Sequence, residues 1–375
     1  YQALGEMEQA RLYTLRGFER ARRYGVQRIL GWLHWNSGAI ALAQGNWTDS
    51  ESHLQQALQE AEHHSDIRLK PVVIQAQAEL AFRQGQWKQA EQFFQASITA
   101  AANTEWYPST LALYGHFLAV TGRRAQARAQ LDRAAAFPEP PGFGGDFYIP
   151  FLAEGYLHLD AKEQAAQYIE RITKLRGFLY YGNAVDRIRG IVAIIAGDWE
   201  QAEQAFEEGL TLCRRAHNAP EEAQILYEQA RAALIQNGSQ DREPQYTLEH
   251  IQSLCERARA IFAEYGMQRA VTLVDTLQEG MRQLERRDVL PLDTILRSQT
   301  KEKTDKTGYI LDIRLTKREQ EVLRLVAEGH TDREVAETLV ISPRTVNRHL
   351  SNIFVKLDMP GRAAAVAYAI RQGMV

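Results

Sequence analysis

A segment of 14 residues recurs five times in the first two-thirds of the chain. Its copies begin at residues 45, 85, 122, 160 and 197, so successive starts are 40, 37, 38 and 37 residues apart. Five positions into each copy lies a small residue, and four positions further on lies a larger apolar one. The small residues are Ser50, Ala90, Ala127, Ala165 and Ala202, and the larger ones are Leu54, Phe94, Leu131, Ile169 and Phe206. Because residues four apart share one face of a helix, each copy predicts a helix whose small residue admits a close neighbour.

A second apolar segment precedes the repeated one, for example over residues 28–44 and 72–84. Each repeat is therefore predicted to be a helical hairpin, and stacked hairpins build a superhelix. The pattern resembles the tetratricopeptide repeat family, in the longer-period form found in large bacterial transcription activators. A weaker copy starts at Gly5 with Ala10 in the small position, and an irregular last copy covers residues 255–266. The first helix of the Gly5 copy is almost wholly missing, so we expect a longer natural chain that does not start at Tyr1.

Two further features of the repeats allow a functional or a structural interpretation. Trp47, Trp87 and Trp199 each lie two residues after the start of a copy. They could form an aromatic row that binds a ligand, but their repeat register favours packing between hairpins. The segment 138–147 is rich in Gly and Pro but lacks the Gly-Lys-Ser/Thr ending of a phosphate-binding loop, so we interpret it as a loop between repeats.

Composition constrains the partners and the compartment. Hydrophobic residues make up 45% of the 375 residues, which is enough for a large core, and the net charge is −3. Residues 301–375 contain 13 Lys+Arg against 10 Asp+Glu, whereas residues 1–300 contain 31 against 37. This gives an acidic bulk and a mildly basic tail. Two cysteines, no apolar run of spanning length and no signal sequence predict a cytoplasmic protein without a disulfide framework or a membrane partner.

The repeat pattern ends before residue 285. Residues 285–314 contain the polar, charged stretch 298–308 and read as a flexible linker. We therefore predict a repeat domain over 1–284, a linker over 285–314 and a separate domain over 315–375. The predicted fold class is all-α throughout.

The last 61 residues carry clear helix signals. Capping boxes run from Thr316 to Glu319 and from Thr331 to Glu334, and Ser342-Pro343 provides an N-cap followed by proline at the first helical position. A fourth helix is expected over about 362–372. Only residues 340–342 separate the second helix from the third, which is the spacing of a helix-turn-helix.

The third helix has two distinct faces. Val346, Leu350, Ile353 and Leu357 recur at helical spacing and are predicted to enter a small core. The other face carries Arg344, Asn347, Arg348 and Ser351, and no acidic residue lies between Glu337 and Asp358. Arg and Asn offer donors to base edges, and a face without carboxylates suits the phosphates of DNA. These four residues are our candidates for base contacts, although a solvated basic face is the simpler alternative for this helix alone.

The unit as a whole resembles the LuxR-type DNA-binding domain. The matching residues are Leu315, Thr316, Arg318, Glu319, Glu321, Val322, Leu323, Gly329, Glu334, Ala336, Leu339, Ser342, Thr345, Val346, His349, Ile353, Lys356 and Leu357. Pro360-Gly361 departs from the family pattern and leaves the start of the fourth helix uncertain. Sigma-factor domains share the helix-turn-helix, but His349 and the Lys356-Leu357 ending favour the LuxR type.

The resemblance implies four helices, with the third in the major groove and the fourth able to form a dimer face. Candidate phosphate contacts are Thr316, Lys317, Thr331, Arg333, Thr345, His349 and Lys356, and dimer-face candidates are Ala364, Ala365, Tyr368 and Ala369. His349 could instead pack at the helix edge, and Lys356 could be an ordinary surface charge.

These features predict a transcriptional regulator that binds double-stranded DNA as a dimer, with a repeat array that senses a small-molecule inducer or a protein partner. RNA polymerase is a further candidate partner. The alternative is a helical-repeat interaction scaffold without sequence-specific DNA binding. No catalytic, metal-binding or cofactor motif is present, so we expect no enzyme activity. Large LuxR-type regulators often carry a nucleotide-binding ATPase module before such repeats, and we expect this chain to be a fragment that lacks it.

Overall fold

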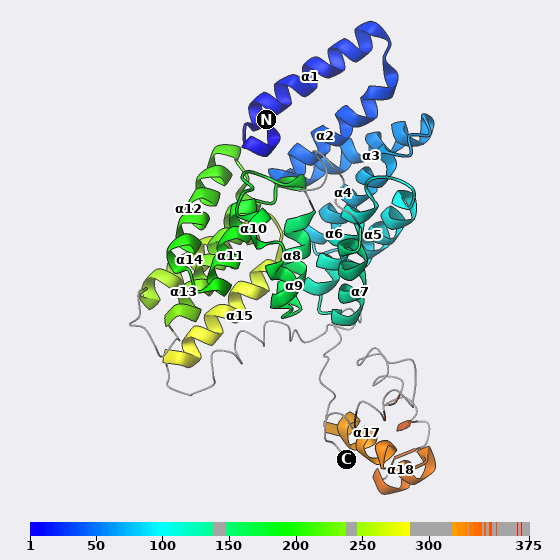
Figure 1. The fold of residues 1–375 in the computed structure, drawn as a ribbon, viewed down its shortest axis with the longest axis vertical. Helices are drawn as coiled ribbons and strands as arrows, with labels where there is room; N and C mark the ends of the chain where they lie inside the picture. The colour runs from blue at the N-terminus through cyan, green and yellow to red at the C-terminus, as the bar shows by residue number, and fades with distance from the viewer. Residues whose placement is uncertain are drawn as a thin grey trace. The chain divides into compact units, whose positions relative to one another are not determined.

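The computed structural model describes residues 1–137, 148–237, 246–285, 317–328, 330–339, 341–342 and 345–346, together with residues 350, 366 and 369. It divides into two compact units, Tyr1–Gln299 and Thr300–Val375. All its named elements are helices, so the predicted all-α fold class is confirmed (Figure 1). The 138–147 loop and nearly all of the 285–314 linker lie outside the described residues, so the domain limits stay predictions.

The first unit is a series of helical hairpins (Figure 1). The pairs are α2 (Leu30–Ala43) with α3 (Trp47–His63), α4 (Leu69–Arg83) with α5 (Trp87–Ala101), α6 (Tyr107–Val120) with α7 (Arg124–Ala135), α11 (Val185–Ala196) with α12 (Trp199–Ala216), and α13 (Ala219–Asn237) with α14 (Leu248–Glu264). The chain starts with η1 (Gln2–Leu4), α1 (Met7–Tyr24) and η2 (Gln27–Ile29). Between α7 and α11 lie α8 (Ile149–His158), α9 (Lys162–Ala166), α10 (Ile169–Ile172) and η3 (Tyr180–Gly182), and α15 (Gln268–Glu285) ends the unit.

The repeat positions pack as their pattern predicts. All five small residues are buried, with at most 2% exposure, and the larger residue four positions on is buried in every copy except the fourth, where Ile169 is partly buried. In three hairpins this larger side chain lies against a glycine of the preceding helix. A Cβ at Gly115 would lie 2.7 Å from Leu131, and a Cβ at Gly190 would lie 2.4 Å from Phe206. Close contact between the paired helices therefore depends on these glycines.

The first residue of every copy adopts a left-handed backbone conformation. The φ angles are 76° at Gly45, 75° at Gly85, 80° at Gly122, 57° at Asp160 and 76° at Gly197. Glycine reaches this region without the penalty of a Cβ, which explains why it recurs at this position. Gly5 has a φ of 74°, and Ala10 is buried, so the weaker copy at the start of the chain follows the same rule.

The fourth copy departs from the prediction. A single helix was expected from Asp160 onward, but α9 and α10 are separated at residues 167–168. The Tyr168 N–H donates to the Ala165 carbonyl at 3.0 Å, three residues back, so the chain tightens out of α-helical geometry at this point. The following segment leads into η3, where the fully buried Tyr181 has a φ of 64°.

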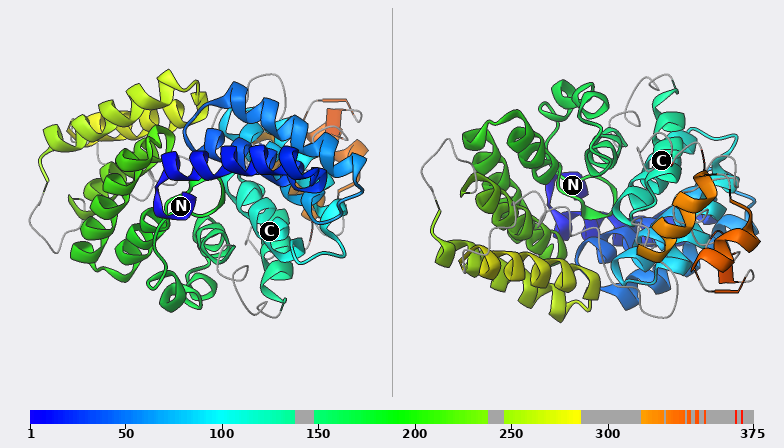
Figure 2. Two further views of the ribbon diagram at one scale, coloured as in Figure 1. Left: turned by 90° about the horizontal axis from the view of Figure 1, so that it is seen from above. Right: turned by 90° about the horizontal axis from the view of Figure 1, so that it is seen from below.

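The end of α14 and helix α15 contact the first two hairpins of the unit (Figure 2). The Trp47 indole donates to the Tyr265 carbonyl at 2.9 Å, and the Arg269 guanidinium lies 4.8 Å from the centre of the Trp87 ring. Gln44 donates to the Ala216 carbonyl at 3.1 Å. Trp47, Trp87 and Trp199 are all partly buried against the cores, which confirms the packing interpretation of these tryptophans. The repeats therefore curve until their two ends contact each other.

Both cysteines, Cys213 and Cys255, are buried free thiols. Burial raises the pKa of both, that of Cys255 to about 12. Within the part of the chain that the structure describes, no helix combines the length and the apolar character needed to cross a membrane. The second unit contains α17 (Lys317–Ala327) and α18 (Asp332–Leu339), with shorter helical pieces after them.

Candidate DNA interface

Helix α18 begins with a complete capping box. The Glu334 carboxylate accepts from the Thr331 N–H at 2.7 Å, and the Glu334 N–H points back to the Thr331 hydroxyl at 3.4 Å. The Thr331 backbone N–H and then its hydroxyl stabilise the charged carboxylate, which lowers the pKa of Glu334. The predicted reciprocal cap is thus present and fixes where the second helix of the unit starts.

The third helix begins at the predicted N-cap. The Thr345 N–H donates to the Ser342 hydroxyl at 3.1 Å, and the Val346 N–H donates to the Ser342 carbonyl at 3.1 Å. Val346 is 0% exposed and Leu350 4%, as their spacing predicts for the inner face. Ile353 and Leu357, predicted for the same face, lie outside the described residues, as do Thr316 of the first capping box and most of the fourth helix.

A small apolar core joins the helices of this unit. Helix α17 contributes Val322, Leu323, Leu325 and Val326, α18 contributes Val335 and Ala336, and Val346, Leu350 and Ala369 complete the cluster. Leu339, Ile341 and Val366 pack at its edge. The Ile341 N–H donates to the Ala336 carbonyl at 2.9 Å, which holds the short turn between α18 and the third helix. The core and the turn together fix the relative direction of these two helices.

The described candidate contacts are polar side chains near helix starts. Thr331 and Arg333 are exposed around the start of α18, and Thr345 is half-buried at the start of the third helix. Lys317 is the first residue of α17. Ala369, predicted for a dimer face, is instead fully buried in the unit's core and offers no surface to a second copy. The candidates outside the described residues are Arg344, Asn347, Arg348, Ser351, Thr316, His349, Lys356, Ala364, Ala365 and Tyr368.

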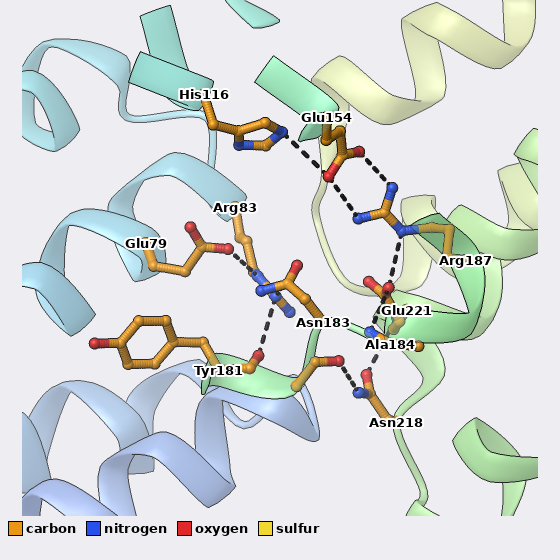
Figure 3. Close-up of polar contacts among 11 residues, drawn as sticks. Glu79, Arg83, His116, Glu154, Tyr181, Asn183, Ala184, Arg187, Asn218 and Glu221 are labelled. Carbon is orange, nitrogen blue, oxygen red and sulfur yellow. Dashed lines mark hydrogen bonds and ion pairs between the residues drawn. The ribbon is translucent and has the colours of Figure 1, made fainter. Parts of the chain in front are cut away.

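The first unit contains a buried polar network that the sequence did not indicate (Figure 3). Arg187 of α11 donates to Glu154 of α8 at 2.5 and 3.3 Å and to Glu221 of α13 at 2.9 Å. Burial by itself lowers the pKa of the Arg187 guanidinium, but the two carboxylates raise it well above its ordinary value. The Ala184 N–H also donates to Glu221 at 2.8 Å. One buried cation therefore joins three helices and the segment after η3.

A second part of this network holds η3 (Figure 3). Arg83 of α4 donates to Glu79 at 2.9 Å and to the Tyr181 carbonyl at 3.0 Å, and Asn218 donates to the Gly182 carbonyl at 2.7 Å. Glu79 is on the same helix as Arg83, but Tyr181 lies 98 residues from Arg83, and Asn218 lies 36 residues from Gly182. No local pattern marks the two long-range pairs, so their sequence signal is the presence of polar and charged residues inside apolar helices.

Two protein families match parts of this chain. The family described as bacterial regulatory proteins, luxR family, matches residues 314–369, and the tetratricopeptide repeat matches residues 41–108. The predicted resemblances of both regions are thereby confirmed. No solved structure matches the chain.

Several curated relatives share the C-terminal region. The spore germination protein GerE of Bacillus subtilis is 46% identical over 59 residues, which cover 16% of this chain and 80% of the relative. The transcriptional regulatory protein LiaR of the same species is 49% identical over 61 residues, covering 16% and 29%. The regulatory protein SdiA of Escherichia coli is 31% identical over 156 residues, covering 41% and 58%. The chain thus spans less than two thirds of the length of LiaR and SdiA.

Proposed function

This chain belongs to the luxR family of bacterial regulatory proteins, transcriptional regulators with a helix-turn-helix DNA-binding domain, and we propose that its second unit reads operator DNA through the third helix in the major groove. Arg344, Asn347, Arg348 and Ser351 are the proposed base contacts. Thr316, Lys317, Thr331, Arg333, Thr345, His349 and Lys356 are the proposed phosphate contacts.

The start of the third helix is the observation that carries this proposal. Ser342 caps it, and Val346 and Leu350 enter the core. By helical spacing, we expect positions 347, 348 and 351 on the opposite face, away from that core. The exposed Thr331 and Arg333 at the neighbouring helix start suit contacts to the DNA backbone on either side of the groove.

The repeat unit is the proposed sensor. An open cavity of about 400 Å³ lies between α5, α6 and α7 and is lined mainly by polar side chains. Glu91, Gln95, Tyr114, Gln130 and Arg133 are among them. Such a lining supports binding of a polar small molecule, and a protein partner remains the alternative occupant of the array. We further propose that the protein binds DNA as a dimer, because one helix-turn-helix covers only a half-site, and that RNA polymerase is a partner.

Substitution of Arg348 tests the reading of DNA. Arg348→Ala in the full chain should weaken binding to a preferred duplex by about 1–3 kcal/mol and relax the base preference at one position. Arg324→Ala is the matched control, because Arg324 lies on α17, 3.5 Å from Glu328, and is not a proposed contact. Affinities of both variants are measured by fluorescence anisotropy on preferred and scrambled duplexes. Equal effects of the two substitutions would remove Arg348 from the base-contact set.

A further inference from the structure

Three potential metal ligands meet where α6 packs on α8 in the first unit. His116 comes from α6, and Glu154 and His158 lie four residues apart on α8. One ligand atom from each residue lies within 4.8 Å of the other two. Because residues four apart share a helix face, α8 presents both of its donors toward the same side. We propose that His116, Glu154 and His158 form a binding site for a divalent transition-metal ion of the zinc type.

The spacing of the donors suits tetrahedral coordination. Zinc bonds to imidazole nitrogen and carboxylate oxygen are about 2.0–2.1 Å long, so two ligands in a tetrahedron are about 3.3 Å apart. Nε2 of His116 and Oε2 of Glu154 are already 3.4 Å apart (Figure 3). His158 is the last residue of α8, and one of its ring nitrogens lies within 4.8 Å of the ligand atoms of the other two residues. Two histidines and one glutamate would leave the fourth position for water.

One potential metal-ligand atom of His116 makes no hydrogen bond among the described residues. Its Nε2 is buried, and its approach to Glu154 lacks hydrogen-bond geometry, so this nitrogen has no hydrogen-bond partner among the residues that the structure describes. A buried polar atom left unpaired costs free energy, and a metal ion would relieve that cost.

Arg187 would orient the glutamate rather than block it. Its shorter contact, 2.5 Å, is to Oε1 of Glu154, and its contact to Oε2 is 3.3 Å, which leaves the nearer oxygen for His116 able to accept another partner. Glu154 and Glu221 together carry two negative charges, and Arg187 between them carries one positive charge. Arg231, which also acts on His158, is paired with Glu228 at 2.9 Å. Arg269 adds a positive charge that opposes a cation, so binding would depend on coordinate bonds from the two imidazoles, which suit zinc, rather than on the net charge of the surroundings.

The test uses the full chain after treatment with a chelator. Cobalt(II) is titrated into the protein, its visible absorption reports tetrahedral coordination, and zinc is then used to displace it. Calorimetry with zinc alone gives the stoichiometry. We expect one site per chain, an intense visible band and a rise in the thermal midpoint of tryptophan fluorescence on adding zinc. The buried Cys213 and Cys255 do not compete, because burial keeps both thiols protonated.

Three variants locate the site. His116→Gln and His158→Gln should each lower zinc affinity at least about tenfold, since even partners outside the ligand set contribute that much. His53→Gln is the matched control, because His34 and His53 form another histidine pair, with Nδ1 atoms 3.0 Å apart. Circular dichroism without metal shows whether each variant folds. If only one of the two ligand variants folds, its zinc affinity alone tests the site. No stoichiometric binding by the wild-type chain, or a site lost only in His53→Gln, would overturn the proposal, whatever the outcome of the DNA experiments.

Discussion

Replacing Arg187 with methionine should strongly destabilise the repeat unit. Arg187 is 4% exposed and is held by Glu154 and Glu221, which are 5% and 3% exposed. Methionine fills similar volume but leaves two buried carboxylates without their cation. Removing one partner of a buried ion pair costs about 3–5 kcal/mol, and we expect the free energy of unfolding to fall by that amount at pH 7.

The same substitution at a surface pair provides the control. Arg68 pairs with Glu105, and their side chains are 66% and 41% exposed. Exposed pairs contribute about 0–1 kcal/mol because water screens them, so Arg68→Met should change stability by no more than that. Both variants are compared with wild type by urea denaturation. All six tryptophans lie within residues 32–199, so tryptophan fluorescence follows the repeat unit alone.

The pH dependence gives this prediction a second, independent outcome. The pKa of Glu154 is held well below its ordinary value of 4.5, so it contributes stability above that pH and loses it as the pH falls. Without Arg187 the buried carboxylates should have raised pKa values and become protonated on acidification. The stability difference between Arg187→Met and wild type should therefore shrink from pH 7 toward pH 4.5. A loss below about 1 kcal/mol at pH 7, or equal losses for the two variants, would refute the assignment of Arg187 as a buried structural cation.

Three further predictions concern other parts of the molecule. Desolvation, with the neighbouring His53, lowers the pKa of His34 to about 4, so the folded state binds fewer protons than the unfolded state, and stability should be lost as the pH falls from about 6.5 toward 4. His34→Gln should flatten this decline in urea midpoints, and an unchanged slope would contradict it. Thr331→Ala removes the α18 cap and should destabilise the second unit by about 0.5–2 kcal/mol. Backbone amides of that unit should then exchange with solvent faster, while tryptophan fluorescence stays unchanged. Amide protection equal to that of the wild type would count against the cap. Leu131→Ala should lower the free energy of unfolding by about 2–5 kcal/mol, because Leu131 is fully buried. Leu15 is 61% exposed, so Leu15→Ala should lower it by less than about 0.5 kcal/mol. Similar losses of stability for the two variants in thermal denaturation would argue against the predicted core.

The repeat architecture could be predicted because it is encoded locally. The spacing of Ala90 and Phe94 within one helix, and glycine at the left-handed position of Gly85, are visible within a few residues of sequence. The same holds for the second unit, where Thr331, Glu334 and Ser342 form the caps that their spacing predicted. In these places propensity, capping and burial all favour the same structure.

The remaining features depend on contacts between distant segments. Trp47 and Tyr265 are 218 residues apart in sequence, and Arg83 reaches Tyr181 across 98 residues, so neither the closed array nor its buried network could be predicted from periodicity. The His116, Glu154 and His158 cluster was missed for the same reason, although the four-residue spacing on α8 was a usable signal. Ala369 was assigned to a dimer face from the resemblance to LuxR-type domains, but it is buried in the unit's own core.

Selection of bound sequences from random duplex DNA by the full chain, with affinities taken at two salt concentrations, tests the central claim most directly. Each neutralised phosphate contributes a slope of about −0.9 in log affinity against log salt, so Lys317, Arg333 and Lys356 predict about −2.7 for each bound copy. A recurring half-site with at least this slope is the result we expect from a DNA-reading regulator. Absence of any enriched sequence, with weak and salt-insensitive binding, would contradict it and favour a helical-repeat scaffold instead.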